Sequence, residues 1–193
     1  SHLSRDGSTL YIVDDGGNAG EKVVAIDLAT GNRTKIGSVF TVFNSNVGGI
    51  AVDEDSGTLY VGVDNDIIAI DLETEVSTII ASESVGGGAD FASVEDLILD
   101  ESEGRLLFVD VVNDAIYDLK LDTGVRSIVS QASVQGEGVE LDNPISLVFS
   151  ADNQSLYVSN QRSNVVASID LATGDRSVLI NTCVDTNGVN SWF

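Results

Sequence analysis

Oxygen-bearing side chains gather in four short stretches of the sequence, at residues 14–18, 64–66, 110–114 and 160–164. Each stretch follows an apolar run. Ca²⁺ takes about six to eight oxygen ligands from carboxylates, amides and carbonyls, so these stretches could hold it if the fold brings them together. Asp and Asn are also the ordinary residues of tight turns and strand ends, and both interpretations stay open at this point.

Groups for acid–base or nucleophilic catalysis are scarce. His2 is the sole histidine and lies at the start of the sequence, which argues against a Ser-His-Asp triad. Cys183 is the sole cysteine; it cannot form an internal disulfide, and no basic residue lies near it to activate its thiol. Carboxylates are too abundant for one glycosidase-like pair to stand out. The residue types indicate binding rather than catalysis.

Arg162 is the one cation within the oxygen-rich stretches. A guanidinium beside an amide such as Asn160 suits an anionic group on a ligand. We therefore expect Arg162 and Asn160 to contribute to ligand binding, with a protein or a glycan as the ligand. The alternative is that Arg162 only balances the charge of a neighbouring aspartate.

Charge and hydropathy exclude several classes of partner. The 193 residues include 9 Lys and Arg against 31 Asp and Glu, which gives a formal net charge of −22. A surface of that sign repels phosphate, which argues against nucleic acid and anionic membranes as partners. Hydrophobic residues make up 42% of the chain, enough for a core, and the apolar runs are too short to insert into a bilayer.

The sequence repeats one element four times. A Leu-Tyr-Val-like run occurs at residues 9–12, 58–61, 106–109 and 155–158, and its aromatic residues recur at intervals of 49, 48 and 49. An Ile-Asp-Leu-like run follows in each copy, and a Thr-Gly turn follows that in every copy except the second. Repeats of this length indicate one supersecondary unit per copy.

Each copy is typical of four short β-strands joined by Gly, Asn and Asp turns. The second and third strands are apolar at consecutive positions, so both of their faces must be covered, whereas the fourth carries charge as an outer strand does. Stacked sheets of this kind make a β-propeller; a parallel β-helix, with about half this period, is the alternative. The sequence predicts an all-β fold of four-stranded antiparallel blades, at about residues 1–43, 44–91, 92–141 and 142–193.

Four copies are fewer than the largest propeller rings contain, and the first copy begins inside its innermost strand. We therefore expect a segment of a larger ring, a compact four-bladed ring, or a homodimer in which two half-rings close on each other. Two local expectations follow from the repeat. Residues 86–88, Gly-Gly-Gly, form a flexible loop between blades, and the recurring Arg33, Arg126 and Arg176 pair across strands with Asp27 and Asp170.

The Leu-Tyr-Val run, the run Ile-Asp-Leu-Ala-Thr-Gly-Asp-Arg at residues 169–176, and Asn143-Pro144-Ile145 at the next inner strand resemble bacterial β-propeller repeats of the NHL and YVTN kind. The chain is more loosely similar to gluconolactonase-like six-bladed propellers. The resemblance covers nearly the whole chain. It implies the propeller fold rather than an activity. Our first hypothesis is a non-enzymatic binding or interaction scaffold, a segment of a larger secreted, periplasmic or cell-surface bacterial protein, with Ca²⁺ as a candidate ligand of the oxygen-rich stretches.

The likeness to gluconolactonase-like enzymes implies an alternative, a metal-dependent hydrolase or lactonase whose divalent ion polarises a carbonyl. That family holds its metal in the channel with a carboxylate at an inner-strand start and with Asn and Asp from other blades. Glu95 and Asn143 occupy comparable starts, and Asp64 and Asp110 lie on facing loops. The sequence departs from the family at residues 94–97, Val-Glu-Asp-Leu, where the family has Glu-Gly-Pro.

Overall fold

The computed structural model describes residues 1–14, 22–36 and 47–181, which form four antiparallel sheets and no helix. We call the sheets blades 1 to 4; blade 3 carries a fifth, parallel strand. The strands are β1 (His2–Leu3), β2 (Thr9–Asp14), β3 (Lys22–Asp27) and β4 (Arg33–Ile36) in blade 1; β5 (Val47–Asp53), β6 (Thr58–Val63), β7 (Asp66–Asp71) and β8 (Ser77–Ala81) in blade 2; β10 (Val94–Asp100), β11 (Arg105–Asp110), β12 (Ala115–Lys120), β13 (Val125–Gln131) and β9 (Gly87–Gly88) in blade 3; and β14 (Pro144–Phe149), β15 (Ser155–Asn160), β16 (Val165–Asp170) and β17 (Arg176–Asn181) in blade 4.

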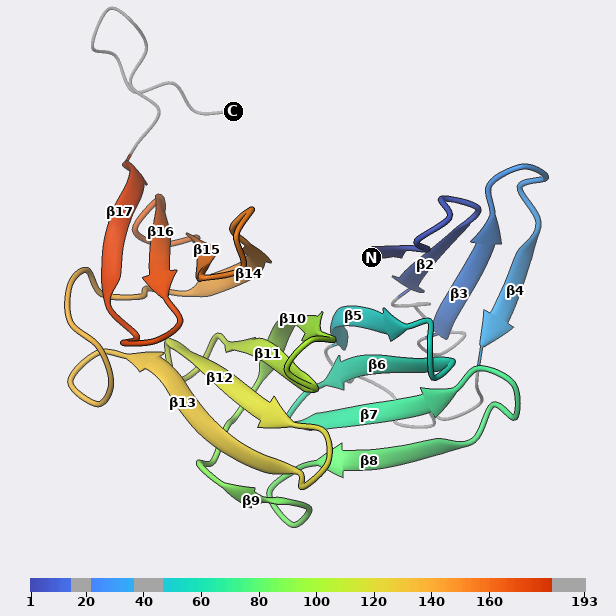
Figure 1. Cartoon of the computed structure of the whole chain (residues 1–193), viewed down its shortest axis with the longest axis horizontal. Helices are drawn as coiled ribbons and strands as arrows, with labels where there is room; N and C mark the ends of the chain where they lie inside the picture. The colour runs from blue at the N-terminus through green and yellow to red at the C-terminus, as the bar shows by residue number, and fades with distance from the viewer. Residues whose placement is uncertain (15–21, 37–46, 182–193) are drawn as a thin grey trace, which may run out of the picture.

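The blades follow one another around an arc, with the first strand of each blade on the inside (Figure 1). Strands β5, β10 and β14 line the concave side, and β4, β8, β13 and β17 lie outside. The arc is open between blade 4 and blade 1 (Figure 1). This architecture confirms the predicted all-β fold of four-stranded antiparallel blades.

Apolar side chains fill the three junctions between successive blades. In β11, Leu106 and Phe108 face blade 2, while Leu107 and Val109 face blade 4, and all four are fully buried. Phe108 stacks on Tyr117 with ring centroids 5.1 Å apart. Consecutive apolar residues therefore fit a strand that is covered on both faces, as the sequence indicates.

The connection from blade 2 to blade 3 runs along the outer edge of blade 3. Gly87 and Gly88 form β9, which pairs in parallel with Val125 and Arg126 of β13. The expectation of a flexible loop here is wrong, because the glycines allow this segment to pack closely against β13. A Cβ at Gly88 would overlap the Arg126 carbonyl oxygen. Strand β9 also belongs to blade 3 although it lies within the range 44–91 expected for blade 2.

The connection from blade 3 to blade 4 repeats this arrangement. Gly138 makes a parallel bridge to Arg176 of β17, and a Cβ at Gly138 would overlap the Arg176 carbonyl oxygen. A Cβ at the preceding Gly136 would overlap the Gly174 carbonyl oxygen in the same way. We call these two connections, residues 82–91 and 131–141, straps.

A buried arginine holds each strap. Arg126 donates from Nε to the Ala89 carbonyl oxygen at 2.9 Å and from Nη1 to the Val85 carbonyl oxygen at 2.8 Å. Arg176 donates in the same way to the Val139 and Gln135 carbonyl oxygens, at 2.6 and 2.9 Å. The two arginines are 4% and 6% exposed. Carbonyl oxygens are good acceptors for a desolvated guanidinium, so each arginine fixes one connection between blades.

The predicted cross-strand pairing of these arginines with aspartates is therefore wrong. Asp170 accepts hydrogen bonds from the Ala172 and Thr173 amides, both at 2.9 Å, and so closes its own turn. Asp27 accepts from the Thr30 amide at 2.7 Å in the same manner. The repeated Asp is thus a turn residue, and the repeated Arg belongs to the outer edge of the blade.

Candidate functional site

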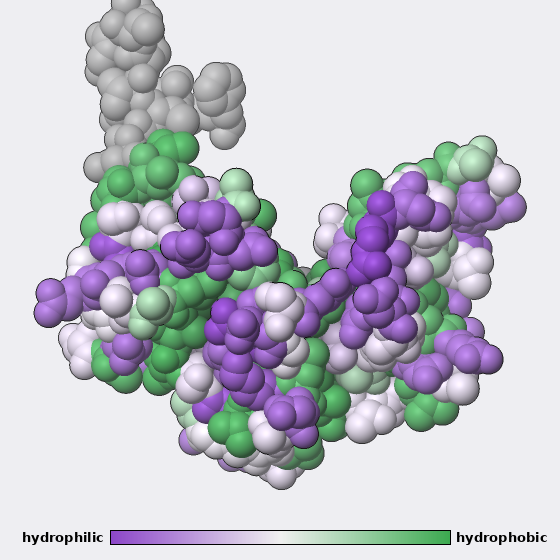
Figure 2. Space-filling model, in the orientation of Figure 1, coloured by the Kyte–Doolittle hydropathy of each residue, from purple (hydrophilic) through white to green (hydrophobic). Residues whose placement is uncertain are grey.

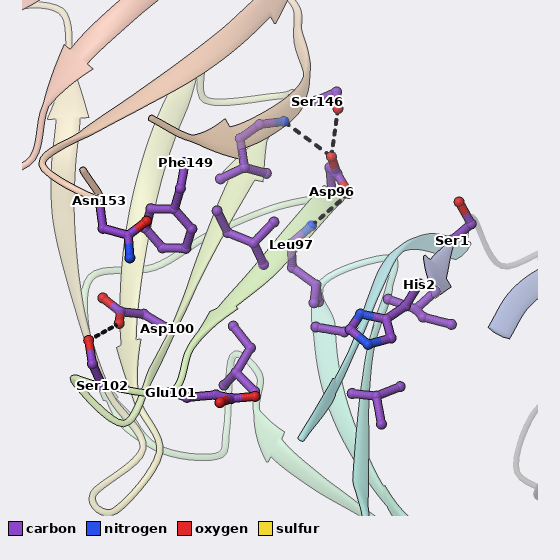
Figure 3. A pocket seen from close by; sticks show the side chains of 16 residues that line it. Ser1, His2, Asp96, Leu97, Asp100, Glu101, Ser102, Ser146, Phe149 and Asn153 are labelled. Atoms are coloured by element: carbon purple, nitrogen blue, oxygen red, sulfur yellow. Dashed lines mark hydrogen bonds between the residues drawn. The ribbon is translucent and has the colours of Figure 1, made fainter. Parts of the chain in front are cut away.

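The concave side of the arc contains a cavity of about 670 Å³. Strands β5, β10 and β14 form its wall, and Ser1 and His2 lie on its blade 1 side (Figure 3). Ile50, Leu97 and Leu147 supply apolar surface, and Asp96, Asp100 and Glu101 bring carboxyl groups. The volume falls within the range of about 300–1,000 Å³ that is usual for ligand pockets.

Asp96 joins blade 3 to blade 4 inside the cavity. Its Oδ2 accepts hydrogen bonds from Ser146 Oγ at 2.8 Å and from the Leu147 amide at 3.1 Å. Its Oδ1 accepts from the Leu97 amide at 3.0 Å (Figure 3). Asp96 therefore holds β14 against β10 while it contributes negative charge to the cavity.

Asp100 lies at the end of β10, where it is 8% exposed. It accepts hydrogen bonds from Ser102 Oγ at 2.7 Å and from Arg105 Nε at 3.0 Å. Burial acts to raise the pKa of Asp100, but the hydrogen bonds from Ser102 and Arg105 and the charge of Arg105 outweigh it and lower the pKa. Asp100 is therefore ionised at neutral pH.

Glu101 lies at the edge of the cavity and pairs with Arg5 from the β1–β2 turn. Arg5 Nη2 lies 3.1 Å from Glu101 Oε1, and Arg5 Nη1 lies 3.0 Å from Asp55 Oδ1. The Arg5 side chain is 55% exposed and the Glu101 side chain 49% exposed. Exposed ion pairs are weak, so a cationic ligand can replace Arg5 at Glu101 with little loss.

His2 lines the cavity beside Tyr11, with ring centroids 6.3 Å apart. Burial lowers the pKa of His2 below its ordinary value of 6.5, and the charges of Glu54 and Glu101 oppose this only in part. The imidazole is therefore neutral at pH 7. The negative charge of the cavity has no histidine cation to offset it.

Asp110, a predicted metal ligand, organises a loop. It is fully buried at the end of β11. Its Oδ2 accepts hydrogen bonds from the Ala92 amide and from Asn113 Nδ2, both at 2.7 Å. Its Oδ1 accepts from the Ser93, Val112 and Asn113 amides at 3.3, 2.9 and 3.2 Å. Five donors occupy the carboxylate, which favours the turn-and-cap interpretation for this residue.

Asn160 ends β15 of blade 4 as Asp110 ends β11 of blade 3, and it is 3% exposed. Its Oδ1 accepts a hydrogen bond from the Asp142 amide at 3.0 Å, and its Nδ2 donates to the Val165 carbonyl oxygen at 3.3 Å. Arg162 is exposed, and its amide donates to the Asp142 carbonyl oxygen at 3.3 Å. The two predicted ligand-binding residues therefore both hydrogen-bond to the backbone of Asp142. The Asn160 side chain faces the interior, whereas Arg162 is exposed at the surface.

The other predicted metal ligands lie at junctions between blades. The Asn143 amide donates to Asp114 Oδ1 at 2.7 Å, and Asn143 Nδ2 donates to Gln161 Oε1 at 2.7 Å. The Asp64 carbonyl oxygen accepts from the Val94 amide at 2.8 Å, one residue before Glu95. Asp64 and Glu95 thus belong to the junction of blades 2 and 3, and Asn143 to the junction of blades 3 and 4.

The structure does not bring these four residues into one cluster. Within residues 1–14, 22–36 and 47–181, no group of three or more His, Cys, Asp or Glu side chains is placed to hold a metal ion. Cys183 lies outside the described residues. The metal site stays a prediction.

Sequence reasoning missed the cavity carboxylate Asp96 and the role of the strap arginines. No local motif distinguishes Asp96 from the many other acidic residues. The arginines had a signal: Gly88 precedes Arg126 by 38 residues, and Gly138 precedes Arg176 by the same interval.

No protein-family model and no curated protein matches the chain. Solved structures do match it. A chain of the nidogen/laminin complex has a TM-score of 0.70 at 20% identity, over 90% of this chain and 59% of that chain. TolB from Acinetobacter baumannii has a TM-score of 0.68 at 16% identity, over 95% and 43%. The extracellular domain of a putative hybrid two-component system from B. thetaiotaomicron has 0.65 at 13%, over 96% and 24%.

The chain has the β-propeller fold. At these identities the likeness shows the fold alone, and this propeller chain spans less than two thirds of each matched chain. In the part of the propeller that the structure describes, no helix is long and apolar enough to cross a membrane.

Proposed function

We propose that this β-propeller chain is a non-enzymatic interaction scaffold whose concave face binds a cationic segment of a protein partner. The observation that carries the proposal is the cavity between β5, β10 and β14, which is lined by Asp96, Asp100 and the half-exposed Glu101. An acidic concave surface attracts and orients a positively charged partner. The net charge of −22 adds a long-range attraction of the same sign.

The comparisons support this proposal at the level of the fold. One matched chain comes from the nidogen/laminin complex, which by its name joins two proteins. Another is described as an extracellular domain. With the acidic composition, this supports a secreted, periplasmic or cell-surface location as part of the proposal. The repeated Leu-Tyr-Val-like and Ile-Asp-Leu-like runs support a repeat of the NHL or YVTN kind.

The test is a calorimetric titration of the chain with a lysine-rich peptide and with a glutamate-rich peptide of the same length. We expect binding of the lysine-rich peptide only, with an affinity that falls as salt rises. Glu101→Gln weakens this binding, because Glu101 lies at the edge of the cavity and a cation of the peptide can replace Arg5 as its ion-pair partner. Glu137→Gln, the same charge change at an exposed position of the second strap, leaves it unchanged. Equal weakening by both substitutions would indicate unspecific charge attraction and would contradict the proposal.

Calcium is a second ligand that we propose for the same chain. The support is the oxygen-rich composition of the junctions that contain Asp64, Glu95 and Asn143, whereas Asp110 would have to release hydrogen bonds to take part. We expect the thermal unfolding midpoint to rise with Ca²⁺ and to fall back with chelator. An unchanged midpoint would rule calcium out. Among the described residues, no observation favours the hydrolase or lactonase alternative over the scaffold.

A further inference from the structure

Arg5 lies between two carboxylates at the edge of the cavity. Its Nη2 is 3.1 Å from both carboxylate oxygens of Glu101, and its Nη1 is 3.0 Å from Asp55 Oδ1. The two acids come from different blades, Asp55 from the β5–β6 turn and Glu101 from the β10–β11 turn. Together they receive both terminal nitrogens of one planar guanidinium. We call Asp55 and Glu101 the carboxylate pair.

The contact of Arg5 with the carboxylate pair is open to exchange. The three side chains are between 49% and 77% exposed, so water reaches all of them. Exposed ion pairs are weak, and a guanidinium that brings further contacts in the cavity can therefore displace Arg5. A lysine ammonium concentrates its charge on one atom and cannot give each acid a nitrogen of its own. The carboxylate pair thus favours arginine over lysine.

Asp96 marks a second position for a cation. Its hydrogen bonds come from the neutral groups of Ser146, Leu147 and Leu97. Among the described residues, none of the ion pairs includes Asp96. A carboxylate accepts up to about four hydrogen bonds. Because Asp96 lines the cavity, it can give its remaining acceptor position to a cationic side chain of a partner.

Asp96 and Glu101 lie five residues apart, near opposite ends of β10 (Figure 3). They also face opposite sides of the strand, since Asp96 contacts blade 4 through Ser146 whereas Glu101 contacts blade 1 through Arg5. An extended segment advances about 3.3 Å per residue and alternates its side chains. Two cations five residues apart on such a segment therefore match both the distance and the alternation of the two acids.

Apolar surface separates the two acidic positions. Ile98 and Leu99 lie between them in the sequence, line the cavity and are partly exposed. Figure 2 shows hydrophilic surface, drawn in purple, along both sides of the hollow that the arc encloses. A segment that fits this surface is apolar between two cationic residues.

We propose that the partner segment at the concave face is extended and carries an arginine that displaces Arg5 from Asp55 and Glu101, with a second cation for Asp96 five residues away in its own sequence. This inference rests on the function proposed above, which requires only that the segment be cationic. Arg5 is then an internal competitor, because it occupies the carboxylate pair in the free chain. Binding exchanges one guanidinium for another, so the carboxylate pair keeps its hydrogen bonds.

The test is a calorimetric titration with three peptides of equal length and net charge. The first has one arginine and one lysine five residues apart in a neutral, partly apolar sequence. The second has the same composition with the arginine and the lysine adjacent, and the third has lysine in place of the arginine. We expect the first to bind most tightly. The other two should have dissociation constants about three- to fivefold higher, because each loses one ionic contact.

Arg5→Ala tests the competition. It should bind the first peptide about three- to fivefold more tightly than the unmodified chain does. Arg33→Ala is the matched control, since it removes the same charge at an exposed position of the same blade, and it should change the affinity much less. Asp55→Asn should abolish the preference for arginine over lysine, whereas Glu73→Gln, at an exposed position of the same blade, should retain it. Thermal unfolding midpoints confirm that each variant is folded.

Equal affinity for the three peptides would overturn this inference, because neither the guanidinium nor its spacing from the second cation would then matter. Equal tightening by Arg5→Ala and Arg33→Ala would also overturn it, because Arg5 would then act only through its charge. The proposed function would survive both results if the lysine-rich peptide still binds and Glu101→Gln still weakens that binding. No binding of any cationic peptide would overturn the proposed function and this inference together.

Discussion

Blade 3 and blade 1 share one order of four antiparallel strands, to which blade 3 adds β9, but they differ in how much of each blade is covered. Blade 3 lies between two blades, and in β11 every residue from Leu106 to Asp110 is buried. Among the described residues, blade 1 has one neighbouring blade, and Leu10, Tyr11 and Ile12 of β2 are half-buried although the same repeat encodes them. The neighbouring blade, more than the hydrogen bonds within a blade, therefore sets the burial of these strands.

Truncating the aromatic residue at one repeat position should destabilise blade 3 more than blade 1. Phe108→Ala in blade 3 should lower the free energy of unfolding by about 3–5 kcal/mol, because the ring is fully buried and stacks on Tyr117. Tyr11→Ala in blade 1 should cost clearly less, since its ring is half-buried. Denaturant unfolding of both variants measures the difference. Equal losses would contradict the comparison.

Removal of the Asp110 carboxylate should have the next largest effect. Asp110→Ala leaves four backbone amides without their acceptor, and each buried unsatisfied donor costs about 1–3 kcal/mol before water or relaxation compensates. We expect a loss of at least about 3 kcal/mol. Asn160→Ala, at the same position of blade 4, removes the acceptor of one amide and should cost less. Chemical denaturation of the pair provides the check, and a larger loss for Asn160→Ala would reverse the proposed order.

The arginines at the outer edge of blades 1 and 3 should differ in their contribution to stability. Arg126→Ala should destabilise the chain by about 2 kcal/mol, because it removes buried, charge-assisted hydrogen bonds to Ala89 and Val85. Arg33→Ala should lower the free energy of unfolding by less than about 0.5 kcal/mol, because Arg33 is exposed. A loss as large as that of Arg126→Ala would contradict the distinction between the buried and the exposed arginine.

The smallest expected effect concerns pH. Since burial lowers the pKa of His2, the folded chain binds a proton there less readily than the unfolded chain does. The stability from neutral His2 is present above its ordinary value of 6.5 and is lost as pH falls through its lowered folded pKa. His2 is the sole histidine, so its ring resonance in a proton NMR titration is unambiguous. We expect a midpoint below 6.5. A midpoint at 6.5 would place His2 in solvent, and a midpoint above it would mean that the charges of Glu54 and Glu101 outweigh burial.

The blades were predictable because consecutive apolar residues in Leu106 to Val109 and their counterparts fix strands that are covered on both faces. The concave cavity could not be predicted, because no local sequence motif distinguishes an inner-strand carboxylate such as Asp96 from the other acidic residues of the chain. The straps were not predicted either. A short Gly-Gly-Gly run is typical of a flexible loop when read alone, and only its distance to Arg126 distinguishes close packing from flexibility.

Hydrogen exchange, measured strand by strand in dilute solution, tests whether a neighbouring blade determines how well a blade is protected. We predict slow exchange in β11 and β12, which lie between two described blades. Strands β2 to β4 should exchange faster, because one described blade covers blade 1. Equal protection of β2 and β11 in dilute solution would contradict the account.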